Sequence, residues 1–218
     1  MAKRIIVGGV LGGIALFIWG ALSHMVLQLG DVGLQSLPAE EAALPALRAA
    51  VKEPGLYFFP AYDMKAMAAL PKEQKEAADK AWTEKWKAGP RGLLIIHPEA
   101  TSAEPMGPHT LLRQFGTDAF ACLLVAFLMS QLSTKARYSC RVGVAATAGF
   151  LSAWVICVPY WNWYGFPGNF VLAQIADRTI GFTLTGLVMA AIVKPPKAET
   201  QVAASTPAAS APAAASQR

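Results

Sequence analysis

Four long apolar stretches constrain the fold of this 218-residue chain more than any other feature. They cover residues 5–29, 116–133, 142–160 and 170–193, and each contains at least 18 residues. A helix of about 20 apolar residues crosses the hydrocarbon core of a bilayer, and it satisfies its own backbone groups, which lipid cannot do. Charged residues make up only 15% of the chain, below the roughly 25% of soluble domains. The sequence therefore predicts an α-helical integral membrane protein with four transmembrane helices.

The segment boundaries follow from these stretches and from the polar sequence between them. The predicted order is a first transmembrane helix with a cytoplasmic N-terminus (1–29), an extracytoplasmic α+β loop domain (30–115), a second transmembrane helix (116–133), a basic cytoplasmic loop (134–141), a third helix (142–160), an outer aromatic turn (161–169), a fourth helix (170–193) and a cytoplasmic tail (194–218). The tail is rich in Ala, Pro and Ser. It cannot bury enough apolar surface to offset the entropy of ordering, so we predict that it is disordered.

The basic residues are concentrated on one side of the predicted membrane. The N-terminal flank, the 134–141 loop and the tail together carry eight basic residues and one acidic residue, whereas residues 30–115 carry ten basic and eleven acidic residues. Cytoplasmic loops of membrane proteins are enriched in Lys and Arg. We therefore predict a multi-pass protein of a bacterial inner membrane with both termini in the cytoplasm. The net charge of +5 then reflects orientation and not nucleic-acid binding.

A cleaved signal peptide is an alternative interpretation of the N-terminus. A basic start (MAKR) precedes an apolar run, and Ala21-Leu22-Ser23 resembles a small-x-small cleavage site. However, the apolar region of a signal peptide is usually about 7–15 residues long, and this run continues past the site to Leu27. We favour an uncleaved first span; cleavage would leave a protein with three spans.

The long segment between the first two spans is predicted to fold. Residues 38–51 are typical of a helix, divided or bent at Pro45, and residues 71–88 form the most regular predicted helix of the segment. Two short apolar runs, LYFF at 56–59 and GLLIIH at 92–97, are strand candidates that we expect to pair. A two-stranded sheet is marginally stable alone. We therefore expect this unit to pack against the membrane helices or the bilayer surface.

The stretch PYWNWYGFPGNF, residues 159–170, connects the third and fourth spans. Its aromatic and amide side chains are Tyr160, Trp161, Asn162, Trp163, Tyr164 and Asn169. Trp and Tyr favour the headgroup layer, where a flat apolar ring and a polar tip are both satisfied. Pro159, Gly165, Pro167 and Gly168 are typical of a tight turn. We interpret the stretch as an interfacial anchor; the alternative is an outward-facing pocket walled by the asparagines and the rings.

Small residues recur at intervals of four in two spans. The first span contains Gly8, Gly9, Gly12 and Gly13, and the third contains Ala145, Gly149 and Ala153. Small side chains let helix backbones approach closely, which matters in lipid because water supplies no driving force for association there. We predict that these residues form helix-packing surfaces and that the first span contacts the third.

Ionisable residues inside the spans are the strongest candidates for a site. The spans contain four of them: His24, Asp118, Asp177 and Arg178. A charge costs roughly 2.5–3.5 kcal/mol at the bilayer centre, so these side chains need partners or a place near the surface. At a rise of about 1.5 Å per residue, all four reach a similar height near the outer boundary. We expect one polar layer there, shared with the rings of Tyr160 and Trp161.

Three interpretations of this polar cluster remain open. In the first it is structural, with Arg178 either snorkelling to the membrane surface or meeting Asp118, and Asp177 accepting a hydrogen bond from His24. In the second it marks a substrate, proton or ion path, with His24 as the titrating group. In the third His24 and the carboxylates bind a metal, but no spacing signature supports such a site. We favour the structural interpretation and predict no metal and no cofactor.

Two classes of function fit the sequence. The first is a non-catalytic scaffold, assembly factor or accessory subunit, which uses its outward loop and small-residue helix faces to bind a membrane protein or a second copy of itself. The second is a small transporter or membrane enzyme with an outward-facing site at the polar cluster. The sequence contains no P-loop, GxGxxG, HExxH or GxSxG motif, and we assign no catalytic residue. We favour the first class, with the lipid bilayer around the spans.

Overall fold

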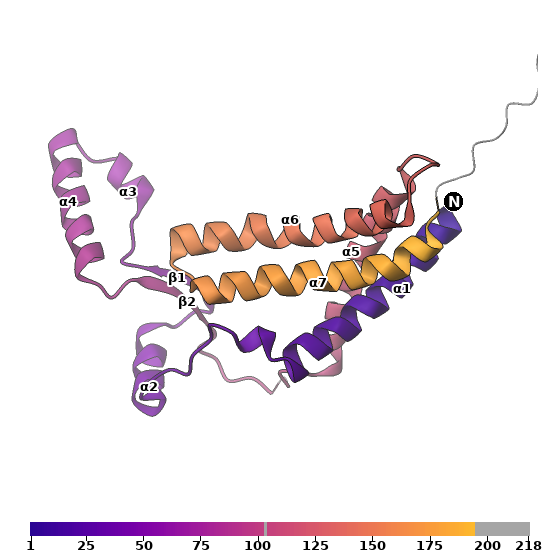
Figure 1. Cartoon of the computed structure of the whole chain (residues 1–218). Helices are drawn as coiled ribbons and strands as arrows, with labels where there is room; N and C mark the ends of the chain where they lie inside the picture. Colours follow the sequence, from indigo (N-terminus) through magenta and orange to yellow (C-terminus); the bar gives the residue numbers. More distant parts are fainter. Residues whose placement is uncertain (103, 195–218) are drawn as a thin grey trace, which may run out of the picture.

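Four long helices dominate the computed structural model, which describes residues 1–102 and 104–194. They are α1 (Ala2–Ala21), α5 (Pro108–Ser130), α6 (Tyr138–Tyr164) and α7 (Gly168–Ile192) (Figure 1). Each is long and apolar enough to cross a membrane, with α1 extended by the π-helical turn η1 (Leu22–Val26). The predicted fold class, four membrane helices with a small α+β region between the first two, is confirmed. The predicted disordered tail lies outside the described residues from position 195 onward.

The third span is longer than the apolar stretch that predicts it, because α6 continues through Pro159 to Tyr164. Gly165, with a φ of +74°, adopts the left-handed conformation that commonly follows the end of a helix. Pro159 therefore lies inside the helix and not in the connection, contrary to expectation. The aromatic residues from Tyr160 to Tyr164 form the last turn of α6, and Trp161 and Trp163 are exposed there.

The four helices form two hairpins that meet through α1 and α7. α6 packs against α7, α1 packs against α5, and α1 also packs against α7. The expectation that the first span packs against the third is wrong, because α1 and α6 share no extended interface. The two glycine pairs of α1 explain the difference. Neighbouring helix positions are about 100° apart, so the pairs lie on two faces and serve two different helices.

Each glycine pair of α1 meets its own partner. A Cβ atom on Gly12 would lie 2.8 Å from the Cγ of Met189 in α7, whereas one on Gly13 would lie 2.6 Å from the Cα of Ala119 in α5. Gly8 faces Val193 in the same way as Gly12 faces Met189. Because the backbones approach this closely, a larger side chain at these positions would push the helices apart.

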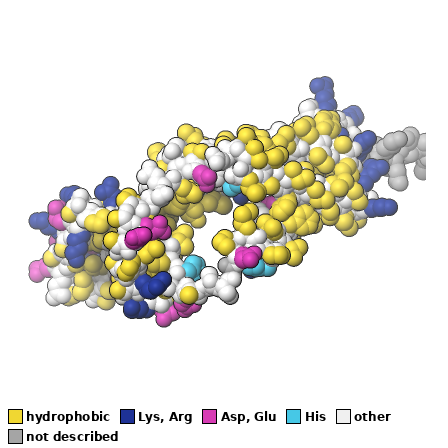
Figure 2. Space-filling model, turned by 90° about the horizontal axis from the view of Figure 1, so that it is seen from below, with side chains coloured by type: hydrophobic (Ala, Val, Ile, Leu, Met, Phe, Trp, Pro, Cys, Tyr) yellow, Lys and Arg dark blue, Asp and Glu magenta, His cyan; other side chains and the backbone are white. Residues whose placement is uncertain are grey.

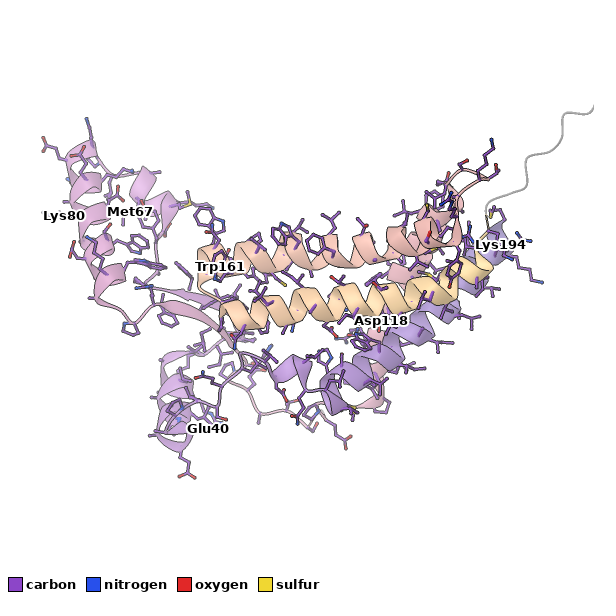
Figure 3. All side chains as sticks on the ribbon, in the orientation of Figure 1. Glu40, Met67, Lys80, Asp118, Trp161 and Lys194 are labelled. Carbon is purple, nitrogen blue, oxygen red and sulfur yellow. The ribbon has the colours of Figure 1, made fainter. Side chains whose placement is uncertain are left out.

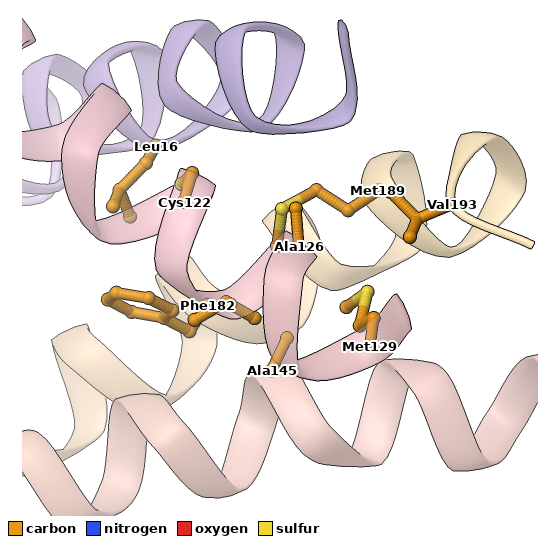
Figure 4. Packing of buried hydrophobic residues seen from close by; sticks show 9 residues of the cluster. Leu16, Cys122, Ala126, Met129, Ala145, Phe182, Met189 and Val193 are labelled. Atoms are coloured by element: carbon orange, nitrogen blue, oxygen red, sulfur yellow. The ribbon is translucent and has the colours of Figure 1, made fainter. Parts of the chain in front are cut away.

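The buried core lies where the helices cross (Figure 4). Its members are Leu16, Cys122, Val125, Ala126, Met129, Ala145, Phe182, Met189 and Val193. The small residues of α6 face α7: a Cβ atom on Gly149 would lie 2.6 Å from the backbone oxygen of Arg178. The outward faces of the helices are apolar and exposed. Figure 2 shows Lys and Arg side chains at both ends of the molecule, but only at the end where the chain begins are they without Asp and Glu among them. We call this the basic end of the bundle.

The loop region, residues 30–107, lies at the end of the bundle opposite the basic end (Figure 1). Strands β1 (Gly55–Phe59) and β2 (Gly92–Ile96) pair antiparallel, with Leu56 opposite Ile95, and the long helix α4 (Lys72–Ala88) lies between them in the chain. The strand pairing and this helix agree with the prediction. The remaining elements are the 3-10 turn η2 (Leu29–Asp31), helix α2 (Glu40–Ala50), which contains Pro45, and the short helix α3 (Met64–Ala68).

A row of aromatic rings connects the loop region to the membrane helices. Tyr62 contacts Trp82, Trp82 stacks on Trp86, and Trp86 contacts Phe58 of β1, with centroid distances of 5.1, 5.4 and 5.6 Å. Phe58 then meets Tyr164 at the end of α6, edge to face at 6.2 Å. The otherwise marginal two-stranded sheet is thus supported by rings of α4 and of α6, both of which contact Phe58.

Candidate functional site

A cavity of about 240 Å³ lies among α1, α5 and α7 and brings the four predicted ionisable residues together. It is lined by Leu16, Phe17, Trp19, Gly20, Ala21, His24, Met25, Met106, Leu111, Gln114, Asp118, Asp177 and Arg178. The polar cluster and an apolar wall therefore share one space. In contrast, none of the aromatic residues from Tyr160 to Tyr164 and neither Asn162 nor Asn169 lines it.

Asp177 is the most tightly held member of the cluster. Its side chain is only 4% exposed, and its Oδ1 accepts a hydrogen bond of 2.8 Å from the indole Nε1 of Trp19. The same nitrogen also lies 3.2 Å from the backbone oxygen of Asp177. Gly181 leaves room for the indole, because a Cβ there would lie 2.6 Å from the ring. The expectation that Asp177 accepts from His24 is wrong: Trp19, one turn earlier in α1, takes that place.

Asp118 has a different local partner. It is also only 4% exposed, and its Oδ1 accepts a hydrogen bond of 3.0 Å from the Nε2 of Gln114, one turn earlier in α5. Arg178 lines the same cavity, but no ion pair joins it to Asp118 within residues 1–102 and 104–194. Of the two places considered for Arg178, direct contact with Asp118 is therefore not formed in this arrangement. The two carboxylates accept hydrogen bonds from neutral donors, Trp19 and Gln114. The guanidinium of Arg178 forms no ion pair in the described chain.

His24 lies at the edge of the cavity on the π-helical turn that ends the first span. Its side chain is exposed, and its Nδ1 lies 3.1 Å from the backbone oxygen of Gly20 and 2.9 Å from the hydroxyl of buried Ser23. The chain then folds back so that Gly30 touches the imidazole ring. A π-helical turn contains more residues than an α-helical turn, and it therefore changes the direction of the side chains that follow it. Here those side chains lie at the mouth of the cavity.

The cavity and the aromatic end of α6 lie at different levels along the helices. At a rise of 1.5 Å per residue, Asp118 lies about 18 Å from the Ser130 end of α5, and Asp177 about 23 Å from the Ile192 end of α7. Tyr160 stacks on Phe166, which contacts Phe170, and Phe170 precedes Asp177 by about 10 Å of helix. The ring of Tyr160 is therefore beyond the cavity and not level with it. Figure 3 shows Asp118 among the helices, away from Trp161 at their end.

The donor set of the cavity does not resemble a metal site. No group of three or more His, Cys, Asp or Glu side chains that could hold an ion occurs in the described chain. No family model, curated protein or solved structure matches this chain. What the site can do chemically is therefore inferred from its geometry: it can hold a molecule that is apolar along one side and charged at one end.

Two cavity residues that bond the carboxylates were missed at the sequence level, and for different reasons. Gln114 precedes Asp118 by four positions, a spacing at which side chains on a helix meet, so this contact was visible in the sequence. Trp19 had no such signal, because its hydrogen bond to Asp177 joins two helices that are 158 positions apart in the chain. The apolar wall, including Met106 from the loop region, likewise depends on the tertiary fold.

Proposed function

We propose that this protein is a non-catalytic membrane protein that binds an amphiphilic molecule in the cavity among α1, α5 and α7. The observation that carries the proposal is the division of the cavity lining into two parts. Leu16, Phe17 and Leu111 give it an apolar wall, while Asp118 and Asp177 are buried carboxylates at the same space. Sites for small molecules usually combine apolar walls with a few placed polar groups. An amphiphile matches both parts.

The packing below the cavity supports binding over passage through the membrane. Towards the basic end, Met129, Met189 and Val193 are completely buried, and Gly12 and Gly13 bring α1 directly against its neighbours (Figure 4). A solute path along the helix axes would have to open this packed core. The cavity is therefore best described as a closed-ended site that is filled from the opposite side.

The distribution of charge supports an orientation for this site. We place the basic end at the cytoplasmic face of a bacterial inner membrane, with both termini inside, because Lys and Arg favour that face. With the hydrocarbon core about 30 Å thick, Asp118 and Asp177 then lie in its outer half. The loop region stands outside the membrane, and an amphiphile would enter from the outer leaflet.

Filling the cavity tests the proposal. Gly20 lines the cavity, and a Cβ atom there would meet nothing within 4 Å, so Gly20→Leu adds bulk without a backbone clash. Gly116→Leu is the matched control, because Gly116 also faces open space but lies outside the cavity lining. Each full-length protein is purified in mild detergent, and co-purified amphiphiles are counted per chain by mass spectrometry. We expect the number of bound amphiphiles per chain to fall by about one in Gly20→Leu and to stay unchanged in Gly116→Leu. Equal counts in both variants would contradict the proposal.

A scaffold that binds a second membrane protein is the other candidate, and the hairpin of β1 and β2 favours it. Leu56 and Ile95, which pair across the strands, are 65% and 71% exposed. The described sheet has only these two strands, so each has an outer edge that another strand could join. The test is copurification in mild detergent. Leu56→Lys should release a bound membrane protein, whereas Lys87→Gln on the exposed face of α4 should keep it.

A further inference from the structure

We infer that the amphiphile is a zwitterionic phospholipid with a primary amine in its headgroup. This inference rests on the proposed function and adds the chemical class of the ligand. It comes from the charges that line the cavity: two carboxylates and one guanidinium, none of which forms an ion pair in the described chain. A ligand that carries one ammonium group and one phosphate would complement these groups.

The carboxylates define the place of the ammonium. Asp118 and Asp177 are each 96% buried, and each uses one oxygen, Oδ1, to accept a hydrogen bond from a neutral donor. The second oxygen of each carboxylate has no hydrogen bond to a described residue. Buried carboxylates need further donors or a counter-charge. An unmethylated ammonium supplies both, because it is positively charged and can donate three hydrogen bonds.

The guanidinium defines the place of the phosphate. Arg178 follows Asp177 in α7 and lines the same cavity, but it forms no hydrogen bond with a described residue. Its five N–H donors form a fork that fits the oxygens of a phosphate, often two at a time. The adjacent positions place the cationic and anionic groups about 100° apart around the helix. A phosphate and an ammonium separated by a short linker can therefore contact both.

The size of the cavity fits a headgroup and not a whole lipid. Its volume of about 240 Å³ lies below the roughly 300–1,000 Å³ of pockets that enclose drug-sized ligands. Met25 and Met106 line the cavity and are largely exposed, so the acyl chains would leave past them into the bilayer. A trimethylated headgroup fits less well, because it has no N–H to give to the carboxylates.

Native mass spectrometry of the full-length protein in detergent tests this assignment. Short-chain phosphatidylethanolamine, phosphatidylcholine and phosphatidylglycerol are added in turn, together with soluble phosphoethanolamine as a headgroup without tails. We expect phosphatidylethanolamine to bind at least about tenfold more tightly than the other two lipids. Asp118→Asn and Asp177→Asn should each reduce this preference, because Asn keeps the size of the side chain and removes its charge. Arg178→Gln should weaken phosphatidylethanolamine and phosphatidylglycerol alike, whereas the change Glu76→Gln on the exposed face of α4 should alter neither.

The outcomes separate the inference from the function on which it rests. Equal affinity for the three lipids, or an unchanged preference in both Asp variants, would overturn the assignment of the headgroup while Gly20→Leu still displaced a lipid. If Gly20→Leu bound every lipid as the unchanged protein does, the cavity itself would not be the site. Binding of phosphoethanolamine as tight as that of the lipid would make a free metabolite the ligand and would also overturn the assignment. The comparison of the three lipids uses the unchanged chain, so it tests the assignment of the headgroup even if a variant does not fold.

Discussion

The carboxylate of Asp177 lies 96% buried in a membrane helix whose other charged residue is the adjacent Arg178. Such a charge costs roughly 2.5–3.5 kcal/mol at the bilayer centre, more than several Leu or Ile residues return. The carboxylate of Asp177 is stabilised by the indole of Trp19 in α1, which donates a hydrogen bond to its Oδ1. The same hydrogen bond links α1 to α7 beside the cavity, so one polar contact both satisfies one carboxylate oxygen and shapes the site.

Removing this donor should therefore destabilise the protein. Hydrogen bonds to charged groups contribute about 1.5–3 kcal/mol, and we expect Trp19→Phe to lose an amount in this range. Trp163→Phe, at the exposed end of α6, is the matched control and should change stability little. Reversible unfolding in detergent mixtures, followed by circular dichroism, measures both. In the double variant with Asp177→Asn, the two losses should be less than additive; full additivity would mean that Trp19 and Asp177 do not interact.

At this scale the sequence predicted which ionisable residues stand out, but not what they bond to. Charge inside an apolar stretch marks Asp118 and Asp177 without any structure. The donor to Asp118 can be predicted from the sequence, because Gln114 lies one turn earlier in the same helix. The donor to Asp177 cannot, because Trp19 belongs to another helix. Arg141 shows the same limit. It counts as a loop cation in the sequence, yet it is buried in the first turn of α6 and its Nε donates to the backbone oxygen of Ala190 at 3.2 Å.

Among the elements, α1 has the largest role, because it packs against both α5 and α7 and forms one side of the cavity. The sequence predicted that its glycines are packing positions, but it did not predict which helices they contact. A spacing of four identifies a face on a helix and leaves the neighbour of that face undetermined. The elements of the loop region were easier to predict, since helix α4 and the two strands follow local pattern and turn residues. Helix α3 was missed, although Asp63 caps it by accepting from the amides of Lys65 and Ala66.

The close contact of α1 with α5 leads to a prediction for Gly13. A Cβ there would lie 2.6 Å from the backbone of Ala119, which cannot move as a flexible side chain can. We expect Gly13→Leu to reduce stability by about 1–3 kcal/mol, the usual range for overpacking. Gly116→Leu on α5 faces open space and should change it far less. Thermal unfolding of the detergent-purified proteins compares them, and similar midpoints for both variants would argue against the α1–α5 contact.

The loop region has its own pH-dependent contact. The hydroxyl of Tyr62 donates to Oδ1 of Asp79 at 2.6 Å, and Lys75 lies 3.3 Å from Oδ2. The hydrogen bond from Tyr62 is the main cause that lowers the pKa of Asp79, and the same bond raises the pKa of Tyr62. A lowered acid pKa stabilises the fold above the unfolded value of about 3.9 and is lost in more acidic solution. A raised Tyr pKa stabilises it below about 10 and is lost above that. The contact should therefore hold between these limits.

Carbon-13 NMR of the Asp79 carboxyl measures this contact directly. We expect its pKa to lie below the reference of about 3.9 and to rise in Tyr62→Phe, because the largest cause of the shift is removed. Lys75→Gln should also raise it, since both the hydrogen bond and the charge of Lys75 lower the pKa of Asp79. A pKa that is the same in Tyr62→Phe and in the unchanged protein would show that the hydrogen bond does not form in solution.

The molecule as a whole separates two tasks along its length. Near the basic end the helices pack through glycines and a fully buried apolar core. Towards the other end α1, α5 and α7 leave a cavity, and the loop region stands beyond it, joined to α6 through Phe58 and Tyr164. We propose that the closed half anchors the protein and that the open half receives an amphiphile from the outer leaflet.

Thiol labelling at Gly20 tests this account most directly. Cys122, Cys140 and Cys157 are first changed to Ala, since all three are free thiols, and Gly20→Cys is then introduced into the cavity wall. Intact cells are treated with a membrane-impermeant, cationic methanethiosulfonate, which the buried carboxylates should attract. We predict rapid labelling from outside the cell and slower labelling when phosphatidylethanolamine is in excess. Labelling that appears only after the cytoplasmic face has been opened, at a rate independent of lipid, would contradict the account.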